Sequence, residues 1–350
     1  MATAESPLPR FTIRDLAAEL GVSHAAVSYA LNGRAGVSDD TRERIVSAAR
    51  RLGWQPNTAA RALAGRGTDS IGLVLARGAD ELASDSFYLR FIAGVQSELS
   101  PRGITLTFQI ADSLASEMEV YRRWAAQKRV DGVIMVDPRV GDPRPQILLD
   151  LGLPSVVVGG QHTGEHVLAV VGADDTSPMV GLIDALRERG HQRIAYIAGP
   201  ADFAHAVDRA NSYRSTMSAA GLPPLEVVNT RYSDREAALA WDRLRGDRPT
   251  AIVADNDQLA VAVLRAARAE GVRVPEELSI VSWEDSPLCE ATTPQLSALW
   301  RDPFGLGRRS AVSILAELSE HSTDLIPIEA AVLRERGSIG TAPDAPRHRP

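Results

Sequence analysis

Aromatic and polar side chains recur where predicted strands end, in the part of the chain after residue 70. The set comprises Phe87, Tyr88, Asp174, Arg209, Asn256, Trp283 and Glu284. An aromatic ring can stack on the apolar face of a sugar, and carboxylate, amide and guanidinium groups can bond its hydroxyls in pairs. These residue types predict a site for a polyhydroxylated small molecule, with Arg209, Asn256 and Glu284 as the favoured contacts.

Three carboxylates of this region have a second interpretation. Asp174, Asp175 and Asp257 also stand where helices are predicted to begin. An aspartate at such a position can accept hydrogen bonds from the backbone N–H groups of the first helical turn. Helix capping and ligand contact both stay open for these three residues.

Patterns typical of enzymes are weak in this chain. Residues 162–166 match the H-x-x-E-H pattern of zinc proteases, but zinc needs that stretch on a helix, and Gly164 and the flanking β-rich runs indicate a loop. The turn at 75–78 lacks the G-x-G-x-x-G pattern of dinucleotide binding. We therefore expect no catalytic residues, no metal and no cofactor.

Alternating apolar strands and amphipathic helices must position the strand-end side chains. Strands are predicted at 71–75, 104–109, 132–136, 155–158, 169–171, 193–198, 226–229, 251–254 and 279–283. Helices are predicted at about 87–101, 114–128, 143–151, 177–189, 208–219, 234–245, 257–270 and 304–319. Such alternation implies doubly wound parallel sheets, and the strands are too many for one sheet of ordinary size. We expect two α/β lobes with a ligand between them at the strand carboxyl ends.

Residues 12–53 are predicted to form three short helices ahead of this body. Thr12 can cap the first helix, with Asp15 at the capping-box position, and Gly21 ends it. Ser23 can cap the second helix and Ser38 the third. Two helices joined by a glycine turn and braced by a third form a helix-turn-helix, whose second helix enters the major groove of DNA.

Two groups of side chains in this head could contact DNA. They are His24, Ala25 and Tyr29 on the outer face of the second helix, and the hydroxyls of Thr12, Ser23 and Ser28. The first group can reach base edges or a thymine methyl group, while hydroxyls and helix N-termini suit phosphate. The alternative is that all are solvated residues of a small structural unit.

A further short helix is predicted just after the head. Pro56 ends what precedes it and Asn57 can cap it, but two turns are too short to be stable alone. In a dimer, two such helices could pack through Ala60 and push both Leu63 side chains into the minor groove, where wedge residues kink DNA.

Charge is unevenly distributed along the 350 residues, whose formal net charge is −7. Residues 1–66 carry nine arginines and six acids, so this segment is basic and the remainder is strongly acidic. A basic head on an acidic body suits a phosphate backbone at one end only. The single cysteine, Cys289, and the absence of a secretory signal or a long apolar run lead us to expect a cytoplasmic protein without membrane contact.

The chain resembles the lactose/galactose/purine repressor family (LacI/GalR-type regulators) over nearly its whole length. Residues 12–65 look like that family's head and hinge. The body matches at residues 71–74, 129–134, 189–195, 256–257, 271–275 and 293–297. The resemblance implies a homodimer, a palindromic operator, a hinge helix that folds on the operator, and an effector domain similar to periplasmic sugar-binding proteins. It assigns DNA contacts to His24, Ala25, Tyr29, Ala60 and Leu63.

Three departures from the family pattern alter the expected pocket. The usual Gly-Tyr/Phe-Asp is Ser282-Trp283-Glu284 here, and an Asn-Pro before the aromatic pair is Asp85-Ser86. Phe203 stands where relatives often place a polar ligand contact, so it joins the predicted effector site. The effector can therefore not be copied from a relative.

These observations predict a ligand-responsive repressor that binds double-stranded operator DNA as a homodimer and a small-molecule effector, for which we expect a sugar. We expect a helix-turn-helix at 10–56, a hinge at 57–68, and a body at 69–340. The body's first lobe should comprise about 69–168 and 300–324, its second lobe about 169–297 and 325–340, and 341–350 a disordered tail. A solute-binding receptor and a nucleotide-dependent enzyme are the alternatives.

Overall fold

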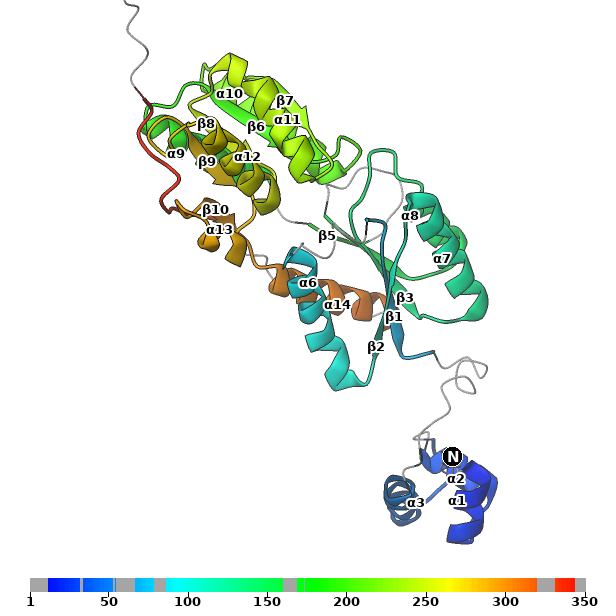
Figure 1. The fold of residues 1–350 in the computed structure, drawn as a ribbon. Helices are drawn as coiled ribbons and strands as arrows, with labels where there is room; N and C mark the ends of the chain where they lie inside the picture. Colours follow the sequence, from blue (N-terminus) through cyan, green and yellow to red (C-terminus); the bar gives the residue numbers. More distant parts are fainter. Residues whose placement is uncertain are drawn as a thin grey trace, which may run out of the picture. The chain divides into compact units, whose positions relative to one another are not determined.

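The structure is a computed structural model that describes residues 12–31, 34–52, 54, 67–78, 86–159, 169–172, 174–319 and 331–343. The chain divides into two compact units, Met1–Thr68 and Asp69–Pro350, which we treat separately. Helices dominate the first unit and two sheets form the second (Figure 1). The predicted combination of an α head and an α/β body with two parallel-sheet lobes is confirmed.

The head contains three helices, α1 (Ile13–Leu20), α2 (His24–Leu31) and α3 (Asp39–Arg51). Thr12 and Asp15 form the predicted capping box, and Gly21 ends α1 in the left-handed conformation with φ 63°. The Ser23 hydroxyl accepts from the Ala26 N–H at 3.1 Å, and Ser38 caps α3. The predicted starts of the three helices and the stop at Gly21 are therefore confirmed.

A small apolar core holds the three helices together. It comprises Leu16, Ala17, Val27, Ala30, Ile45, Ala48 and Ala49. Arg42 of α3 links it to α2, because its guanidinium donates to the Ala30 carbonyl at 3.4 Å, and it also donates to the Arg34 carbonyl at 2.7 Å. The outer face of α2 is thus presented by a packed unit.

The first lobe of the body is built on a parallel sheet of order β2-β1-β3-β4-β5. Its strands are β1 (Ser70–Leu75), β2 (Thr105–Ile110), β3 (Gly132–Met135), β4 (Ser155–Val158) and β5 (Ala169–Val171). Helices α6 (Ser86–Leu99) and α14 (Pro303–Ser319) cover one face, and α7 (Leu114–Gln127) and α8 (Arg144–Asp150) cover the other (Figure 1). The apolar side chains of β1 alternate between the two faces, which explains its complete burial.

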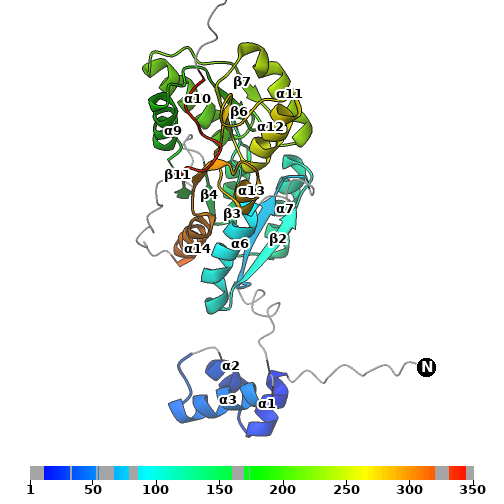
Figure 2. The same ribbon diagram turned by 60° about the vertical axis from the view of Figure 1, so that its left-hand side comes forward.

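Helices α6 and α14 lie far apart in sequence but side by side in space (Figures 1 and 2). They approach at Gly94 and Gly307, where a Cβ atom would overlap the backbone carbonyls of Phe304 and Phe91 respectively. Glycine at both positions permits this close crossing. It anchors the C-terminal helix α14 in the first lobe.

The second lobe has a sheet of order β11-β10-β9-β8-β6-β7. Its strands are β6 (Ile194–Ala198), β7 (Val227–Asn229), β8 (Ala251–Ala254), β9 (Ser279–Ser282), β10 (Ser297–Trp300) and β11 (Val332–Arg334). Only β11 runs antiparallel to its neighbour among the described strands. Two buried clusters cover the faces, one with α9 (Thr176–Glu188) and α10 (Ala204–Ala219), the other with α11 (Asp234–Leu244), α12 (Asp257–Ala269) and α13 (Pro287–Ala291).

Several details correct the sequence prediction. Strands β10 and β11 and helix α13 were not predicted, and α10 begins at Ala204, before the expected start at 208. Residues 169–171, expected in the second lobe, pair with β4 and belong to the first lobe. Residues 341–343, expected in a disordered tail, are among the described residues, and the Ala342 N–H donates to the Arg189 carbonyl at 2.8 Å.

Several predictions fall outside the described residues. They include the H-x-x-E-H stretch at 162–166 and the short helix with Asn57, Ala60 and Leu63. Within the described ranges, no helix is long and apolar enough to cross a membrane.

Candidate functional site

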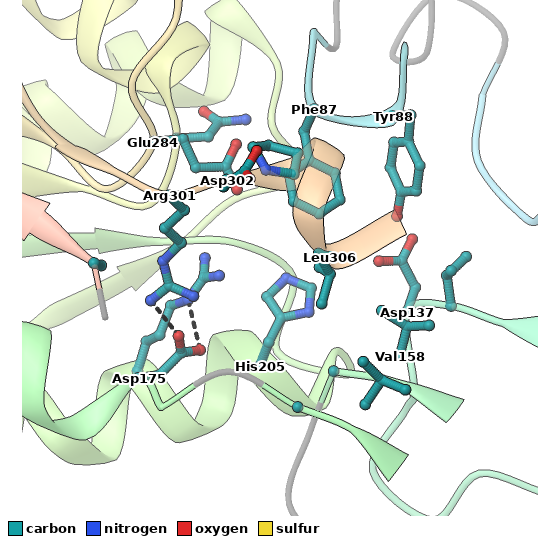
Figure 3. A pocket seen from close by; sticks show the side chains of 18 of the residues that line it. Phe87, Tyr88, Asp137, Val158, Asp175, His205, Glu284, Arg301, Asp302 and Leu306 are labelled. Carbon is teal, nitrogen blue, oxygen red and sulfur yellow. Dashed lines mark hydrogen bonds and ion pairs between the residues drawn. The ribbon is translucent and has the colours of Figure 1, made fainter. Parts of the chain in front are cut away.

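A pocket of about 500 Å³ is lined by residues of both lobes of the body (Figure 3). Phe87, Tyr88, Val158 and Leu306 give it an apolar wall from the first lobe. Asp175, Arg209, Asn256 and Glu284 give it polar groups from the second lobe. Its size and mixed lining are typical of a small-molecule site.

Arg209 is the centre of the polar side. Its Nε donates to Asp175 at 3.0 Å and its Nη1 to Asp255 at 3.0 Å. The guanidinium carbon lies 5.1 Å from the ring centre of Trp283, whose side chain is fully buried beneath it. Two carboxylates and a stacked ring therefore fix the orientation of the guanidinium.

Asp175 links Arg209 to a second cation. It also accepts a hydrogen bond from Arg301 (Figure 3). The Arg301 guanidinium carbon lies 5.2 Å from the ring centre of Trp283. Burial alone would raise the pKa of Asp175, but the charges of Arg209 and Arg301 outweigh it and lower the pKa to about 2. Asp175 is thus ionised and bound by two arginines at the pocket wall.

Asp255 is a buried hydrogen-bond acceptor that links several residues on the polar side of the pocket. It is fully buried and accepts from the hydroxyls of Tyr196 at 2.6 Å and Tyr232 at 2.8 Å, besides Arg209. Burial opposes its ionisation, yet Arg209 and these donors leave its pKa below the ordinary value. The Gly199 N–H donates at 3.1 Å to Oδ2, the oxygen that also accepts from Tyr232, and this bond joins the end of β6 to the same network.

A second ion pair stands at the other end of the pocket. Arg77 donates two hydrogen bonds to Asp137, at 2.7 and 3.0 Å. His205 lies between this pair and the Asp175 group (Figure 3), and its ring nitrogen is 3.2 Å from the Tyr232 hydroxyl. Burial, aided by the charge of Arg209, lowers the pKa of His205 to about 4, so the imidazole is neutral at pH 7.

Six of the eight residues predicted for the effector site line this pocket. They are Phe87, Tyr88, Asp174, Arg209, Asn256 and Glu284. The structure brings them together from five different segments of the chain. Direct contact with a ligand remains a prediction for each of them.

The other two predicted residues do not line the pocket. Trp283 is fully buried under Arg209 and Arg301, so it supports the guanidinium groups instead of presenting its ring to a ligand. Phe203 is 5% exposed and packs between Arg77 and Arg139. Both predictions of a lining position are wrong, because other side chains stand between these rings and the cavity.

The three carboxylates that could either cap a helix or contact a ligand differ in their roles. Asp174 caps α9 by accepting from the backbone of Thr176 at 2.8 Å, and it also lines the pocket. Asp175 forms ion pairs and makes no side-chain cap. Asp257 lies outside the pocket lining and accepts from Ser286, while Asn256 caps α12 through the Leu259 N–H at 2.9 Å.

Sequence reasoning missed several lining residues. They are Arg77, Asp137, His205, Tyr232, Arg301, Asp302 and Arg309. Arg77 and Asp137 lie two residues beyond the ends of β1 and β3, so the rule that found the other residues could have found these. Arg301 directly follows β10 and carries the same signal, but that strand was not predicted. Tyr232 lies between β7 and α11, and His205 lies at the start of α10.

The head offers an exposed surface on α2. His24, Ala25 and Ser23 are exposed, Ser28 is partly buried, and Tyr29 is 39% exposed although its ring packs on Gly36. Thr12 uses its hydroxyl in the capping box of α1. The exposed face of α2 therefore fits the predicted DNA-reading surface, while contact with DNA stays a prediction.

Comparison with protein families gives two matches along the chain. Residues 12–57 match the family described as bacterial regulatory proteins, lacI family. Residues 183–339 match the periplasmic binding protein-like domain. These ranges include the helices of the head and most of the second lobe.

Individual relatives resemble the chain from end to end. It is 33% identical over 321 residues to the HTH-type transcriptional regulator CelR of Thermobifida fusca, covering 90% of this chain and 94% of that one. It is 27% identical to the HTH-type transcriptional repressor PurR of Vibrio atlanticus, covering 94% and 99%.

Solved structures show the same architecture. The complex of the transcriptional regulator CelR with cellobiose has a TM-score of 0.72 and 31% identity, covering 94% of this chain and 100% of that one. The lac repressor dimer bound to operator and the anti-inducer ONPF has a TM-score of 0.81 at 22% identity, covering 95% and 100%, and so supports the fold.

Proposed function

Because this chain belongs to the LacI family of bacterial regulatory proteins, as a transcriptional repressor with an effector-binding domain, we propose that it acts as a homodimer whose affinity for a palindromic operator is controlled by a sugar bound between its lobes. The observation that carries the effector part is the two-sided pocket. Phe87 and Tyr88 offer rings on one side, and Arg209, Asn256 and Glu284 offer hydrogen-bonding groups on the other.

The pocket suits a polyhydroxylated, uncharged ligand better than a strongly charged one. Arg77 is paired with Asp137, and Arg209 and Arg301 share Asp175. A ligand charge would have to compete with these pairs, whereas sugar hydroxyls can both donate to the carboxylates and accept from the guanidinium groups. The complex of the relative CelR with cellobiose makes a glucose disaccharide the first candidate.

The head is the part of the protein that would bind the operator. We infer that His24, Ala25 and Tyr29 read a half-site in the major groove, with Ser23 and Ser28 at phosphates. Two heads in a homodimer would then require a palindromic site. The segment with Asn57, Ala60 and Leu63 would act as a hinge helix whose leucines open a central base step.

Control of the operator requires that the two states of the body differ in their effect on the hinge. A coupling of about 1–3 kcal/mol between effector and operator would change operator affinity by roughly 5–150-fold. By linkage, operator DNA must change effector affinity by the same factor. This reciprocity separates true allosteric control from independent binding at two sites.

A screen in two steps tests the proposal. Thermal shift with a panel of sugars, cellobiose first, should identify a ligand that stabilises the body. Footprinting on bound genomic DNA should then reveal a protected palindrome whose occupancy changes when that ligand is added. No protected palindrome under any ligand condition would refute the repressor function.

Variants assign the two activities to their surfaces. His24→Ala should weaken operator binding and leave the ligand-induced thermal shift intact. Arg243→Ala, which removes only an exposed ion pair with Glu226 on the second lobe, should leave both unchanged. Equal loss of operator binding in both variants would contradict the assigned role of α2.

A further inference from the structure

Two loops from different lobes pair through their backbones beside the pocket. The Val140 N–H donates to the Asp202 carbonyl at 2.9 Å, and the Ala204 N–H donates to the Pro138 carbonyl at 2.8 Å. Between these bonds, Arg139 and Phe203 face each other in an antiparallel bridge. Residues 138–140 of the first lobe and 202–204 of the second thus form a miniature sheet across the cleft.

Side chains reinforce this pairing. The Arg139 guanidinium lies 3.9 Å from the ring centre of Phe203 and forms an ion pair with Asp202. Arg77, also from the first lobe, lies 5.0 Å from the same ring. Phe203 of the second lobe is therefore held between two cations of the first, an arrangement favoured by the negative face of the ring.

The first-lobe half of this contact is held in place by residues of its own lobe. Asp142 accepts from the Arg139 N–H at 2.9 Å and from Arg144. Arg144 is 1% exposed and also donates to the carbonyls of Val136 at 3.1 Å and Asp137 at 2.6 Å. The loop that follows β3 is thus fixed by groups of its own lobe, which lowers the entropy cost of docking.

We propose that residues 138–140 and 202–204, with Arg77 packed on Phe203, form a latch that holds the two lobes together. The latch stands at one end of the pocket, because Asp137, His205 and Tyr232 line that end and border the paired loops. It adds to the proposed function a regulatory element that needs neither ligand nor DNA.

The latch has a consequence for effector binding. If a ligand binds only when the lobes are closed, its apparent affinity is reduced by the fraction of protein that is closed before binding. Contacts that keep the lobes closed remove this loss, so effector affinity depends on residues that never touch the effector. Arg139 and Phe203 are therefore positioning residues for the site.

Hydrogen exchange of the full-length, ligand-free protein tests the latch directly. The Val140 and Ala204 amides should be protected, and Arg139→Ala should accelerate their exchange by roughly three- to ten-fold. The Val133 amide, bonded to Pro154 within the first lobe, and the Asp255 amide, bonded to Ile197 within the second, serve as internal references and should not change. Wild-type exchange at Val140 and Ala204 as fast as in unstructured peptide would overturn the latch.

Further variants separate the latch from general destabilisation. Asp202→Ala removes a largely exposed side chain and should accelerate the same two amides, but should add little to Arg139→Ala, because the two residues form one ion pair. Phe203→Leu keeps an apolar side chain while removing the ring, and should match Arg139→Ala. Arg187→Ala, which breaks an exposed pair with Asp184, is the matched control and should have no effect. If Arg139→Ala behaves like that control, the latch is refuted whether or not the protein binds an operator.

Discussion

The body contains two buried arginines with similar partners and different surroundings. Arg144 in the first lobe is 1% exposed and binds Glu117 and Asp142, and Arg209 in the second lobe is 7% exposed and binds Asp175 and Asp255. Arg144 also donates to two backbone carbonyls, so its guanidinium is enclosed by its own lobe. Arg209 borders the pocket, and among the described residues no partner is seen for its Nη2.

The difference shows that a buried guanidinium group can stabilise the fold at one position and be available to bind a ligand at another. A guanidinium has five N–H donors, and a fully enclosed one must find acceptors for nearly all of them within the protein. Arg144 does so and orients a loop. Arg209 is held rigidly by two carboxylates and a tryptophan ring, yet keeps a donor for an incoming hydroxyl.

The largest expected effect is the loss of Arg144. Arg144→Ala would leave Glu117 and Asp142 buried without their counter-charge, which costs about 3–5 kcal/mol of folding free energy. We expect the melting temperature to fall by about 5–10 °C. Thermal unfolding followed by circular dichroism measures this, with Arg187→Ala as the exposed control. Equal melting temperatures for the two variants would mean that Arg144 has no structural role.

The comparison of these arginines also shows how far sequence reasoning reaches. Apolar runs located every strand of the first sheet, and the strand-end rule found Arg209, Asn256 and Glu284, because strand ends are local features. The rule does not say which ends meet, and it gave no role to Arg144, which lies at the start of α8 and whose buried contacts depend on the fold. Strands β10 and β11 are short and pair with distant segments, and their position depends on tertiary contacts.

Phe203 illustrates the same limit at a single residue. Family resemblance placed it at the ligand site, and it does lie next to lining residues. It does not line the cavity, and its ring packs against Arg77 and Arg139, which follow two different strands of the other lobe. A preference that arises from a contact between lobes cannot be derived from the local pattern.

Replacement of Arg209 tests the recognition side of the comparison. Arg209→Lys keeps the positive charge between Asp175 and Asp255 but loses the planar fork and its stacking on Trp283. We expect effector affinity to fall by about 10–100-fold, from one lost charged hydrogen bond and poorer positioning. Titration calorimetry with the ligand identified by thermal shift measures the change. Unaltered affinity would place Arg209 in the same structural class as Arg144.

The pKa of His205 reports how far the residues around Arg209 are shielded from solvent. Its pKa of about 4 lies below the ordinary 6.5, so its contribution to stability is complete above pH 6.5 and is lost as the pH falls towards 4. Between pH 7 and pH 5 the protein should lose about 1–2 kcal/mol from this residue, allowing for its contact with solvent in the pocket.

His205→Asn should reduce that loss of stability in acid. Melting temperatures of both proteins at pH 7 and pH 5 provide the measurement. His191 has a pKa lowered by burial too, but it is unchanged in the variant and acts equally in both proteins. An identical fall in the two proteins would show that His205 already titrates near its ordinary pKa.

The smallest expected effect comes from the acid beside Arg144. Glu117 Oε1 accepts from Arg144 at 2.8 Å and from the Tyr121 hydroxyl, while Oε2 is buried without a partner among the described residues. Burial raises the pKa of Glu117 above its ordinary value, so its ionised form is less stable in the folded protein than in water. Glu117→Gln keeps the accepting oxygen and removes the charge, and Asp142 still balances Arg144. We expect a change within about 1 kcal/mol, measured by the same thermal unfolding. A loss as large as that of Arg144→Ala would show that the first-lobe network depends on the charge of Glu117 as well as on its hydrogen bonds.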